Sequence, residues 1–161
     1  MPILRKLLQA QRAASAADLN GTIEGRIGLV TGSGTILPCA NAPVYLLVKP
    51  LDLEDVKQKA VRDGVFNPLL AHMFVEYVVS SPEIQNRLAY ARTRTDARGR
   101  FTFANLPGDR WYYVVAQALT GQALASWQVA VYLYPRERVQ IFLHNANAAL
   151  PVCAPSAGAS G

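Results

Sequence analysis

The chain has few of the residues that most often carry chemistry. Its 161 residues include only two histidines, His72 and His144, and two cysteines, Cys39 and Cys153. Neither pair has a metal-ligand spacing such as His-x-x-x-His or Cys-x-x-Cys. A nucleophile triad needs a histidine beside a serine or cysteine, together with an acid that orients it. Cys39 with His144 stays open as such a pair, but an unactivated thiol is the better interpretation. We therefore expect no catalytic residue, no metal site and no cofactor.

Long apolar runs are also missing. No run approaches the roughly 20 apolar residues that cross a bilayer, so we expect no transmembrane segment. Residues 1–19 carry Arg5 and Lys6, but polar residues such as Gln9 and Arg12 interrupt any apolar stretch of a secretion signal. We expect either a cytoplasmic protein or one whose signal has been removed.

The charge and composition exclude two further classes of protein. The net charge of +5 is spread without a basic run, so we expect no nucleic-acid partner. A chain that is 51% hydrophobic and 17% charged is not disordered throughout. Its length suits one domain. We expect an amphipathic helix at 1–19, a folded domain at 20–148 and a flexible tail at 149–161.

The stretch 93–118 organises the predicted domain. Asp96 and Gly99 are the first and fourth residues of a predicted type I turn, in which Gly99 supplies a left-handed residue. Phe101 and Phe103 then alternate with polar residues, as in a half-buried strand. Pro107 ends that strand, because proline cannot donate to a sheet.

Similar alternation recurs along the rest of the chain and predicts seven short strands. They cover about 22–30, 42–49, 90–95, 100–103, 111–117, 127–134 and 139–144. Strands of this length at hairpin spacing favour a mainly β, seven-stranded antiparallel sandwich of two sheets.

Residues 51–88 predict a helical insertion between the second and third strands. Asp52 is a plausible N-cap for a helix that ends at Gly64, and Asn67 precedes a proline at the start of a second helix. Ser81 and Pro82 are the predicted start of a third short helical turn that runs through Leu88. The apolar stripes of these helices would cover the outer face of the sheet. A long edge strand at 72–80 is the alternative.

Both ends of the chain carry a predicted feature. Leu4, Leu7 and Leu8 share one side of the N-terminal helix, and could dock on the domain or pair with a partner. Cys39 and Cys153 each lie in a loop beside proline and could close the domain with a disulfide, or could be two unrelated thiols.

Four segments, followed by the alternating residues Tyr112, Val114 and Ala116, together resemble a known family. They are Gly25-Arg26-Ile27, the run 41–46 (Asn-Ala-Pro-Val-Tyr-Leu), the run 95–103 (Thr-Asp-Ala-Arg-Gly-Arg-Phe-Thr-Phe) and Leu106-Pro107-Gly108. Over roughly residues 20–145 the chain resembles the carboxypeptidase regulatory-like domain, although the helical insertion departs from that pattern. The resemblance implies a transthyretin-like (prealbumin-like) Greek-key sandwich. It also implies a non-catalytic module of a periplasmic, cell-envelope or secreted protein, while a cytoplasmic location stays open.

Two groups of side chains are candidate binding residues. Arg92 and Arg94 share a strand face, with Arg98 and Arg100 expected across the hairpin. This group is either a site for an acidic partner or, as we favour, a solvated strand edge.

The second group is aromatic and consists of Trp111, Tyr113, Tyr132 and Tyr134. We expect these rings to be core residues under the inserted helices, but an open face would let them stack on sugar rings. The sequence thus predicts a protein-interaction or assembly module, with a carbohydrate-binding module as the alternative.

Overall fold

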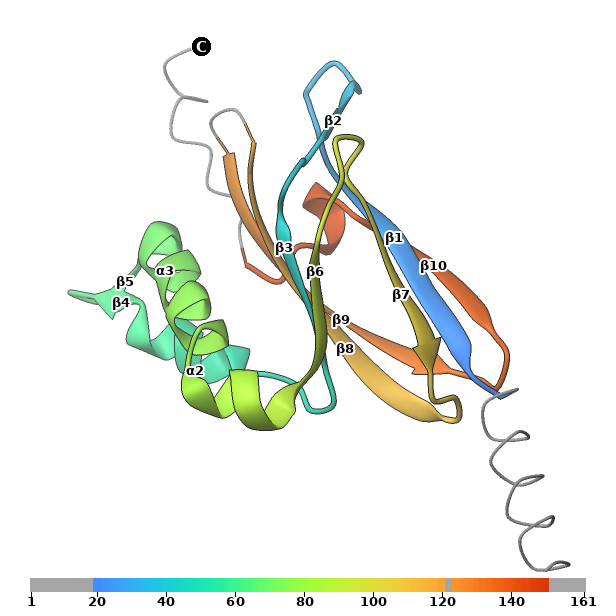
Figure 1. The fold of residues 1–161 in the computed structure, drawn as a ribbon. Helices are drawn as coiled ribbons and strands as arrows, with labels where there is room; N and C mark the ends of the chain where they lie inside the picture. The colour runs from blue at the N-terminus through green and yellow to red at the C-terminus, as the bar shows by residue number, and fades with distance from the viewer. Residues whose placement is uncertain (1–18, 121–122, 151–161) are drawn as a thin grey trace, which may run out of the picture.

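The computed structural model describes residues 19–120 and 123–150 (Figure 1). Within these residues the strands are β1 (Gly21–Val30), β2 (Ile36–Pro38), β3 (Pro43–Leu47), β4 (Val61–Arg62), β5 (Val65–Phe66), β6 (Ala89–Arg94), β7 (Arg100–Leu106), β8 (Arg110–Thr120), β9 (Ala123–Leu133) and β10 (Arg138–Leu143). The helices are α2 (Leu53–Lys59), α3 (Pro68–Val79), a π-helical turn η1 (Ile84–Leu88) and a 3₁₀ turn η2 (Asn145–Asn147). No helix in the described ranges is both long and apolar enough to span a bilayer.

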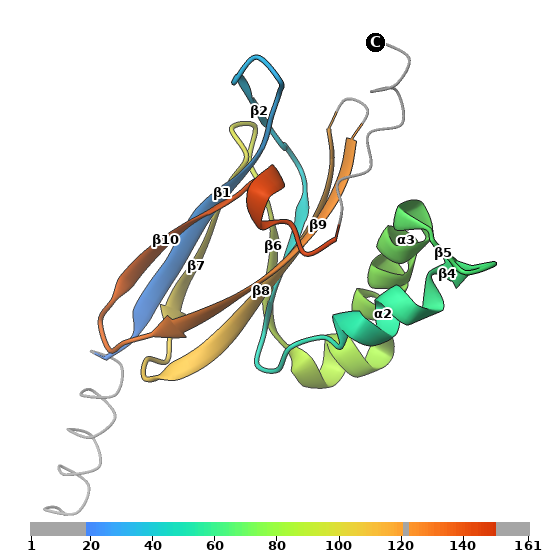
Figure 2. The same ribbon diagram turned by 180° about the vertical axis from the view of Figure 1, so that it is seen from behind.

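Two sheets face each other and form the predicted sandwich (Figures 1 and 2). One sheet has the order β6-β3-β8-β9, and in the other β1 pairs with β10, β7 and β2. The alternating residues of the facing strands fill the space between them. Their largest buried side chains include Ile23, Phe101, Leu46, Tyr112 and Trp127. Phe101 and Phe103 point into this core, as their spacing predicts.

The prediction of an entirely antiparallel sandwich is wrong at one pairing. β10 runs parallel to β1, from Thr22 opposite Arg138 to Ile27 opposite Leu143. After β9 the chain turns and crosses to the other sheet, where the Thr22 N–H donates to the Glu137 carbonyl at 2.9 Å. The crossing brings β10 alongside β1 in the same direction. The seven longer strands lie where the alternation predicts them, and β2, β4 and β5 are short additions among the described residues.

The predicted hairpin around Gly99 is a turn between the two sheets. The turn itself is confirmed, because the Gly99 N–H donates to the Asp96 carbonyl at 3.0 Å. However, β6 pairs with β3, whereas β7 pairs with β1. The Gly99 carbonyl accepts from the Ile27 N–H at 2.7 Å, which holds the start of β7 against β1.

The helical insertion lies between β3 and β6, as predicted. The prediction that its first helix ends at Gly64 is wrong, because α2 ends at Lys59 and Gly64, with a φ angle of 77°, lies in the turn that joins β4 to β5. Asp52 caps α2 by accepting from the Asp55 N–H at 3.0 Å, and Asn67 caps α3 by accepting from the Leu70 N–H at 3.1 Å. The alternative strand at 72–80 is wrong, since α3 runs to Val79. The insertion covers part of the outer face of the β6-β3-β8-β9 sheet. Its second core contains Leu47 and Val115 from the sheet, and Val56, Ala71, Val75 and Val79 from the helices.

Candidate functional site

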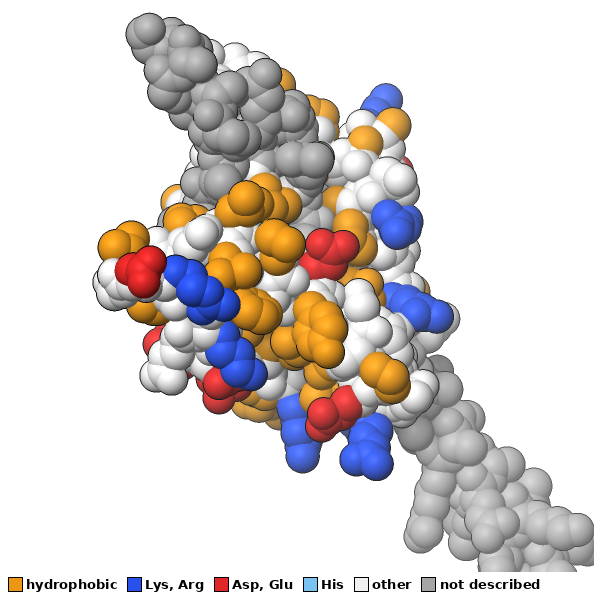
Figure 3. All heavy atoms as spheres, turned by 90° about the vertical axis from the view of Figure 1, so that its left-hand side faces the viewer, with side chains coloured by type: hydrophobic (Ala, Val, Ile, Leu, Met, Phe, Trp, Pro, Cys, Tyr) orange, Lys and Arg blue, Asp and Glu red, His pale blue; other side chains and the backbone are white. Residues whose placement is uncertain are grey.

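The outward side of the insertion carries an exposed apolar surface. We call it the α3 surface, and it consists of Val61, Val65, Leu69, Met73 and Tyr77. These side chains are 40% to 75% exposed. Figure 3 shows hydrophobic side chains gathered on this side of the molecule. Leu69, Met73 and Tyr77 are spaced four residues apart on α3, so they form one stripe along the helix.

The composition of α3 explains why its outer side is apolar. Glu76 is the one charged residue among its 12 residues. Its inner side is buried against the sheet through Ala71, Val75 and Val79. A helix that is hydrophobic all round is normally buried all round. The sheet therefore buries only the inner side of this helix and leaves its outer apolar side chains in solvent.

A buried polar cluster fixes α3 on the sheet. The Nδ1 atom of His72 lies 2.7 Å from the Ser126 Oγ atom. The Gln117 amide donates to that Oγ atom at 2.9 Å and to the His72 carbonyl at 2.8 Å. Spacing along the chain could not reveal this pair, because 54 residues separate its members. Both side chains are at least 98% buried, so the pair ties α3 to β9 and does not present a nucleophile.

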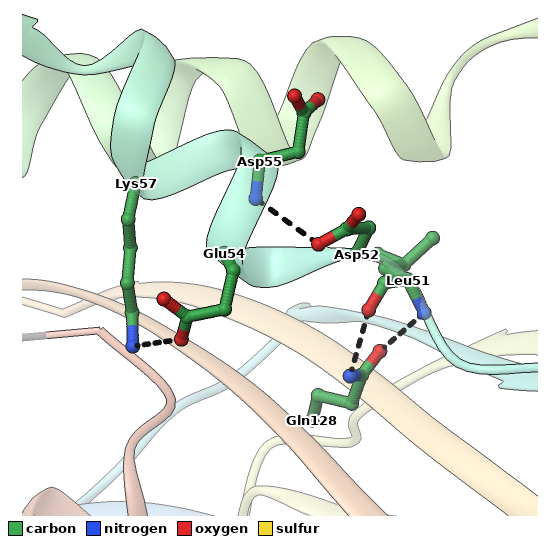
Figure 4. A network of polar contacts seen from close by, with 6 residues as sticks. All are labelled: Leu51, Asp52, Glu54, Asp55, Lys57 and Gln128. Carbon is green, nitrogen blue, oxygen red and sulfur yellow. Dashed lines mark hydrogen bonds and ion pairs between the residues drawn. The ribbon is translucent and has the colours of Figure 1, made fainter.

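A second polar contact seats the start of α2 on the same sheet (Figure 4). The Gln128 side chain accepts from the Leu51 N–H at 2.8 Å and donates to the Leu51 carbonyl at 3.2 Å. Both backbone groups of one residue are thus satisfied by one amide. The two polar contacts tie α3 and the start of α2 to the sheet beneath them.

The insertion covers only part of the predicted aromatic group. Tyr113 packs against the second core, as expected. Trp111 and Tyr134 are 53% and 61% exposed, so the expectation that they are core residues is wrong. The inserted helices stop short of this end of the sheet, which leaves Trp111, Tyr132 and Tyr134 as an open aromatic cluster.

The rings of the aromatic cluster support one another. Tyr132 meets Trp111 at 5.3 Å and Tyr134 at 4.9 Å between ring centroids, and both contacts are edge-to-face. The Tyr132 hydroxyl donates to the Asp109 carboxylate, and this hydrogen bond raises the pKa of Tyr132. The cluster is therefore an ordered aromatic surface beside a carboxylate.

The four predicted arginines do not form one patch, because β6 and β7 belong to different sheets. Arg92 and Arg94 lie on β6 opposite Tyr45 and Pro43, where Arg92 donates to the Gln85 side chain and Arg94 donates to the Asn41 carbonyl at 3.0 Å. Arg98 is exposed in the turn. Arg100 lies on β7 opposite Arg26.

Of the other residues that the sequence singles out, Cys39 and His144 lie in the described ranges. Cys39 is buried, which raises the pKa of its thiol to about 11 and keeps it protonated at neutral pH. His144 caps η2 by accepting from the Ala146 N–H at 3.2 Å. Nothing in the ranges 19–120 and 123–150 groups three or more potential metal ligands. The helix with Leu4, Leu7 and Leu8, and the disulfide partner Cys153, fall outside these ranges and stay predictions.

Comparison with known proteins does not assign the chain to a family. No protein-family model and no curated protein sequence matches it. One similar solved structure is a Pseudomonas aeruginosa protein for which carbohydrate binding has been suggested. It is 20% identical with a TM-score of 0.49, over 84% of this chain and 95% of the other.

Two further similar structures belong to much longer proteins. The Bacillus anthracis TIE protein is 12% identical with a TM-score of 0.43, over 77% of this chain and 17% of that protein. The full-length major pilin SpaD from Corynebacterium diphtheriae is 10% identical with a TM-score of 0.43, over 78% of this chain and 31% of the pilin. These similarities are too distant to identify a relative, and the carboxypeptidase regulatory-like domain remains a resemblance.

Proposed function

We propose that the chain is a non-catalytic protein-interaction or assembly module of a cell-envelope or secreted protein. The observation that carries this proposal is the exposed apolar side of α3. A partner protein with an apolar face would bury the α3 surface and complete the packing that the sheet begins.

The chemistry of the α3 surface supports this role. Contiguous exposed apolar patches are unusual on monomeric proteins and typically mark interaction sites. Met73 and Tyr77 are residue types enriched at interfaces, and methionine adapts its shape to a partner. The backbone of α3 is hydrogen-bonded and packed onto the sheet, so a partner would not have to order the helix on binding.

Photo-crosslinking tests the proposal directly. A photoreactive phenylalanine analogue replaces Met73 in one variant, and replaces Leu37, an exposed β2 residue away from the insertion, in the control. We expect a discrete protein adduct from position 73, in extracts of the cells that make the protein or with a second copy. Adding Leu69→Asp or Tyr77→Asp should remove it, while circular dichroism stays unchanged. No adduct at position 73, or the same adduct from position 37, would contradict the proposal.

The N-terminal leucines provide a second proposed contact for assembly. Leu7→Asp or Leu8→Asp should reduce self-association in sedimentation velocity if that helix pairs with another. An unchanged sedimentation profile would leave the α3 surface as the proposed contact.

A second candidate function is carbohydrate binding, which the open aromatic cluster favours. Exposed aromatic rings stack on the apolar faces of sugars, and Asp109 could accept from sugar hydroxyls. We expect glycan-array binding that Trp111→Ala abolishes without loss of folding. Tyr113→Phe is the control, since Tyr113 lies under the insertion. Binding that survives Trp111→Ala would rule out this site.

A further inference from the structure

The outer face of the β10-β1-β7 sheet holds a shallow, open cavity. Its volume is about 480 Å³. The side chains that line it include Glu24, Arg26, Arg100, Thr102, Gln140 and Phe142. This face points away from the helical insertion (Figures 1 and 2). The cavity is therefore separate from both the α3 surface and the aromatic cluster.

Two arginines on neighbouring strands line this cavity. Arg26 on β1 and Arg100 on β7 are direct cross-strand partners, and both are exposed. The Arg26 guanidinium lies over the Phe142 ring at 4.4 Å from its centroid, which holds it in place. Like charges directly opposite each other destabilise a strand pair. Unfavourable pairings of this kind, which the fold itself does not need, commonly occur at functional sites.

The nearby carboxylates are already engaged. Glu24 accepts from Arg138 Nε at 3.1 Å and from the Gln140 amide at 2.9 Å. Asp96, at the end of the hairpin, accepts from the backbone N–H groups of Arg98 and Arg100 at 2.8 and 2.9 Å. Among the described residues no carboxylate forms an ion pair with Arg26 or Arg100, although Asp96 attracts Arg100 through space, so both guanidinium groups can accept an external anion.

We propose that this cavity binds a carboxylate-bearing saccharide, such as a uronic acid residue. The Arg26 and Arg100 guanidinium groups supply the positive charge and the donors that recognise its carboxylate, since guanidinium groups suit planar oxyanions. Thr102 and Gln140 supply neutral hydrogen-bonding groups for the sugar hydroxyls. The cavity volume falls within the range of small-ligand sites.

The same face is poorly suited to an acidic peptide. The backbone of β1 is paired on both sides at residues 24–26, with β10 and with β7, so no strand can be added there. Three apolar residues line the cavity, and they offer little open apolar surface to a peptide. Phe101 is buried in the core, Ile141 is half-buried, and the Phe142 ring is covered by Arg26. The charge and the hydroxyl-binding groups together favour a saccharide.

Isothermal titration calorimetry with trigalacturonic acid tests the proposal. Its fully methyl-esterified form, which has the same rings without the charge, is the matched ligand control. We expect the acid to bind and the ester to bind at least about tenfold more weakly, because each charge-assisted hydrogen bond is worth a tenfold effect or more. Arg26→Gln and Arg100→Gln should each weaken binding of the acid by a similar factor.

Arg87→Gln is the protein control, since Arg87 is an exposed arginine on the insertion and its loss lowers the net charge equally. It should leave binding unchanged. No binding of the acid, equal binding of the ester, or an equal effect of Arg87→Gln would each overturn the proposal. None of these outcomes depends on a protein partner at the α3 surface.

Discussion

Gly99 closes the turn between the two sheets, and its position has no room for a side chain. Its φ angle is 76°, and a Cβ atom there would lie 2.4 Å from the Ile27 carbonyl oxygen and 3.1 Å from the Cys39 nitrogen. We expect Gly99→Ala to lower the free energy of unfolding by more than the roughly 1–3 kcal/mol that left-handed strain costs. Urea unfolding measures the loss.

Gly34→Ala separates strain from collision in the same experiment. Gly34 has a φ angle of 84°, but a Cβ atom there would meet nothing within 4 Å. Gly34→Ala should therefore show the strain alone. Equal losses for the two variants would mean that the contact with the Ile27 carbonyl has relaxed.

Asp96 makes the same turn sensitive to acid. Its carboxylate accepts backbone hydrogen bonds from Arg100 and Arg98, and these bonds lower the pKa of Asp96. A carboxyl whose pKa is lower in the folded state stabilises the fold above its unfolded pKa of about 3.9. That stabilisation is lost as the pH falls through the folded-state pKa.

Thermal unfolding between about pH 7 and pH 2 tests this pH dependence. Asp96→Ala should be less stable than the wild type at neutral pH, and the difference should shrink in acid. Asp96→Asn keeps one acceptor oxygen without a titrating charge, so its stability should depend less on pH. A difference between wild type and Asp96→Ala that is constant with pH would contradict this account.

At the scale of elements, one amide positions α2. Gln128 satisfies both the N–H and the carbonyl of Leu51 on a half-buried part of the sheet. Gln128→Ala should cost about 1–2 kcal/mol, because it leaves the Leu51 N–H without a partner, while the Leu51 carbonyl still accepts from the Leu53 N–H at 3.1 Å. Hydrogen exchange should show faster exchange in α2 than in the wild type, with β8 little changed.

Gln128→Glu is the matched variant. It keeps the acceptor for the Leu51 N–H but loses the donor for the Leu51 carbonyl. A carboxylate oxygen would then face the Leu51 carbonyl oxygen, so at neutral pH Gln128→Glu should be at least as destabilising as Gln128→Ala. Uniform destabilisation of α2 and β8 would show that the insertion and the sheet unfold together.

At the scale of the whole molecule, the insertion is a cover for the sheet. Leu47 and Val115 are fully buried beneath it, and β3 and β6 are adjacent strands that a short turn could join. Replacing residues 50–88 by such a turn would expose both side chains, at about 1.5–3 kcal/mol each. We expect this deletion to bind the dye ANS and to aggregate.

A compensated deletion tests that explanation. Leu47→Thr with Val115→Thr makes the uncovered face more polar while keeping β-branched residues that suit strands. These changes should restore a monomer in size-exclusion chromatography. A deletion that stays monomeric without them would show that the cover contributes little.

The sequence alone determined what depends on neighbours a few residues apart. Asp52 and Asn67 cap helices through their own third-following N–H groups, Gly99 closes its turn, and Phe101 alternates into the core. These contacts form within one turn or one strand, so the pattern of residues contains them.

Only the tertiary structure decided which strands pair and which faces stay open. It placed β10 parallel to β1, separated β6 from β7, and set Arg26 opposite Arg100. It also covered Tyr113 while leaving Trp111 in solvent, although both lie on the same face of β8. Such outcomes depend on apolar burial summed over segments far apart in the chain, and no local pattern of residues encodes that sum.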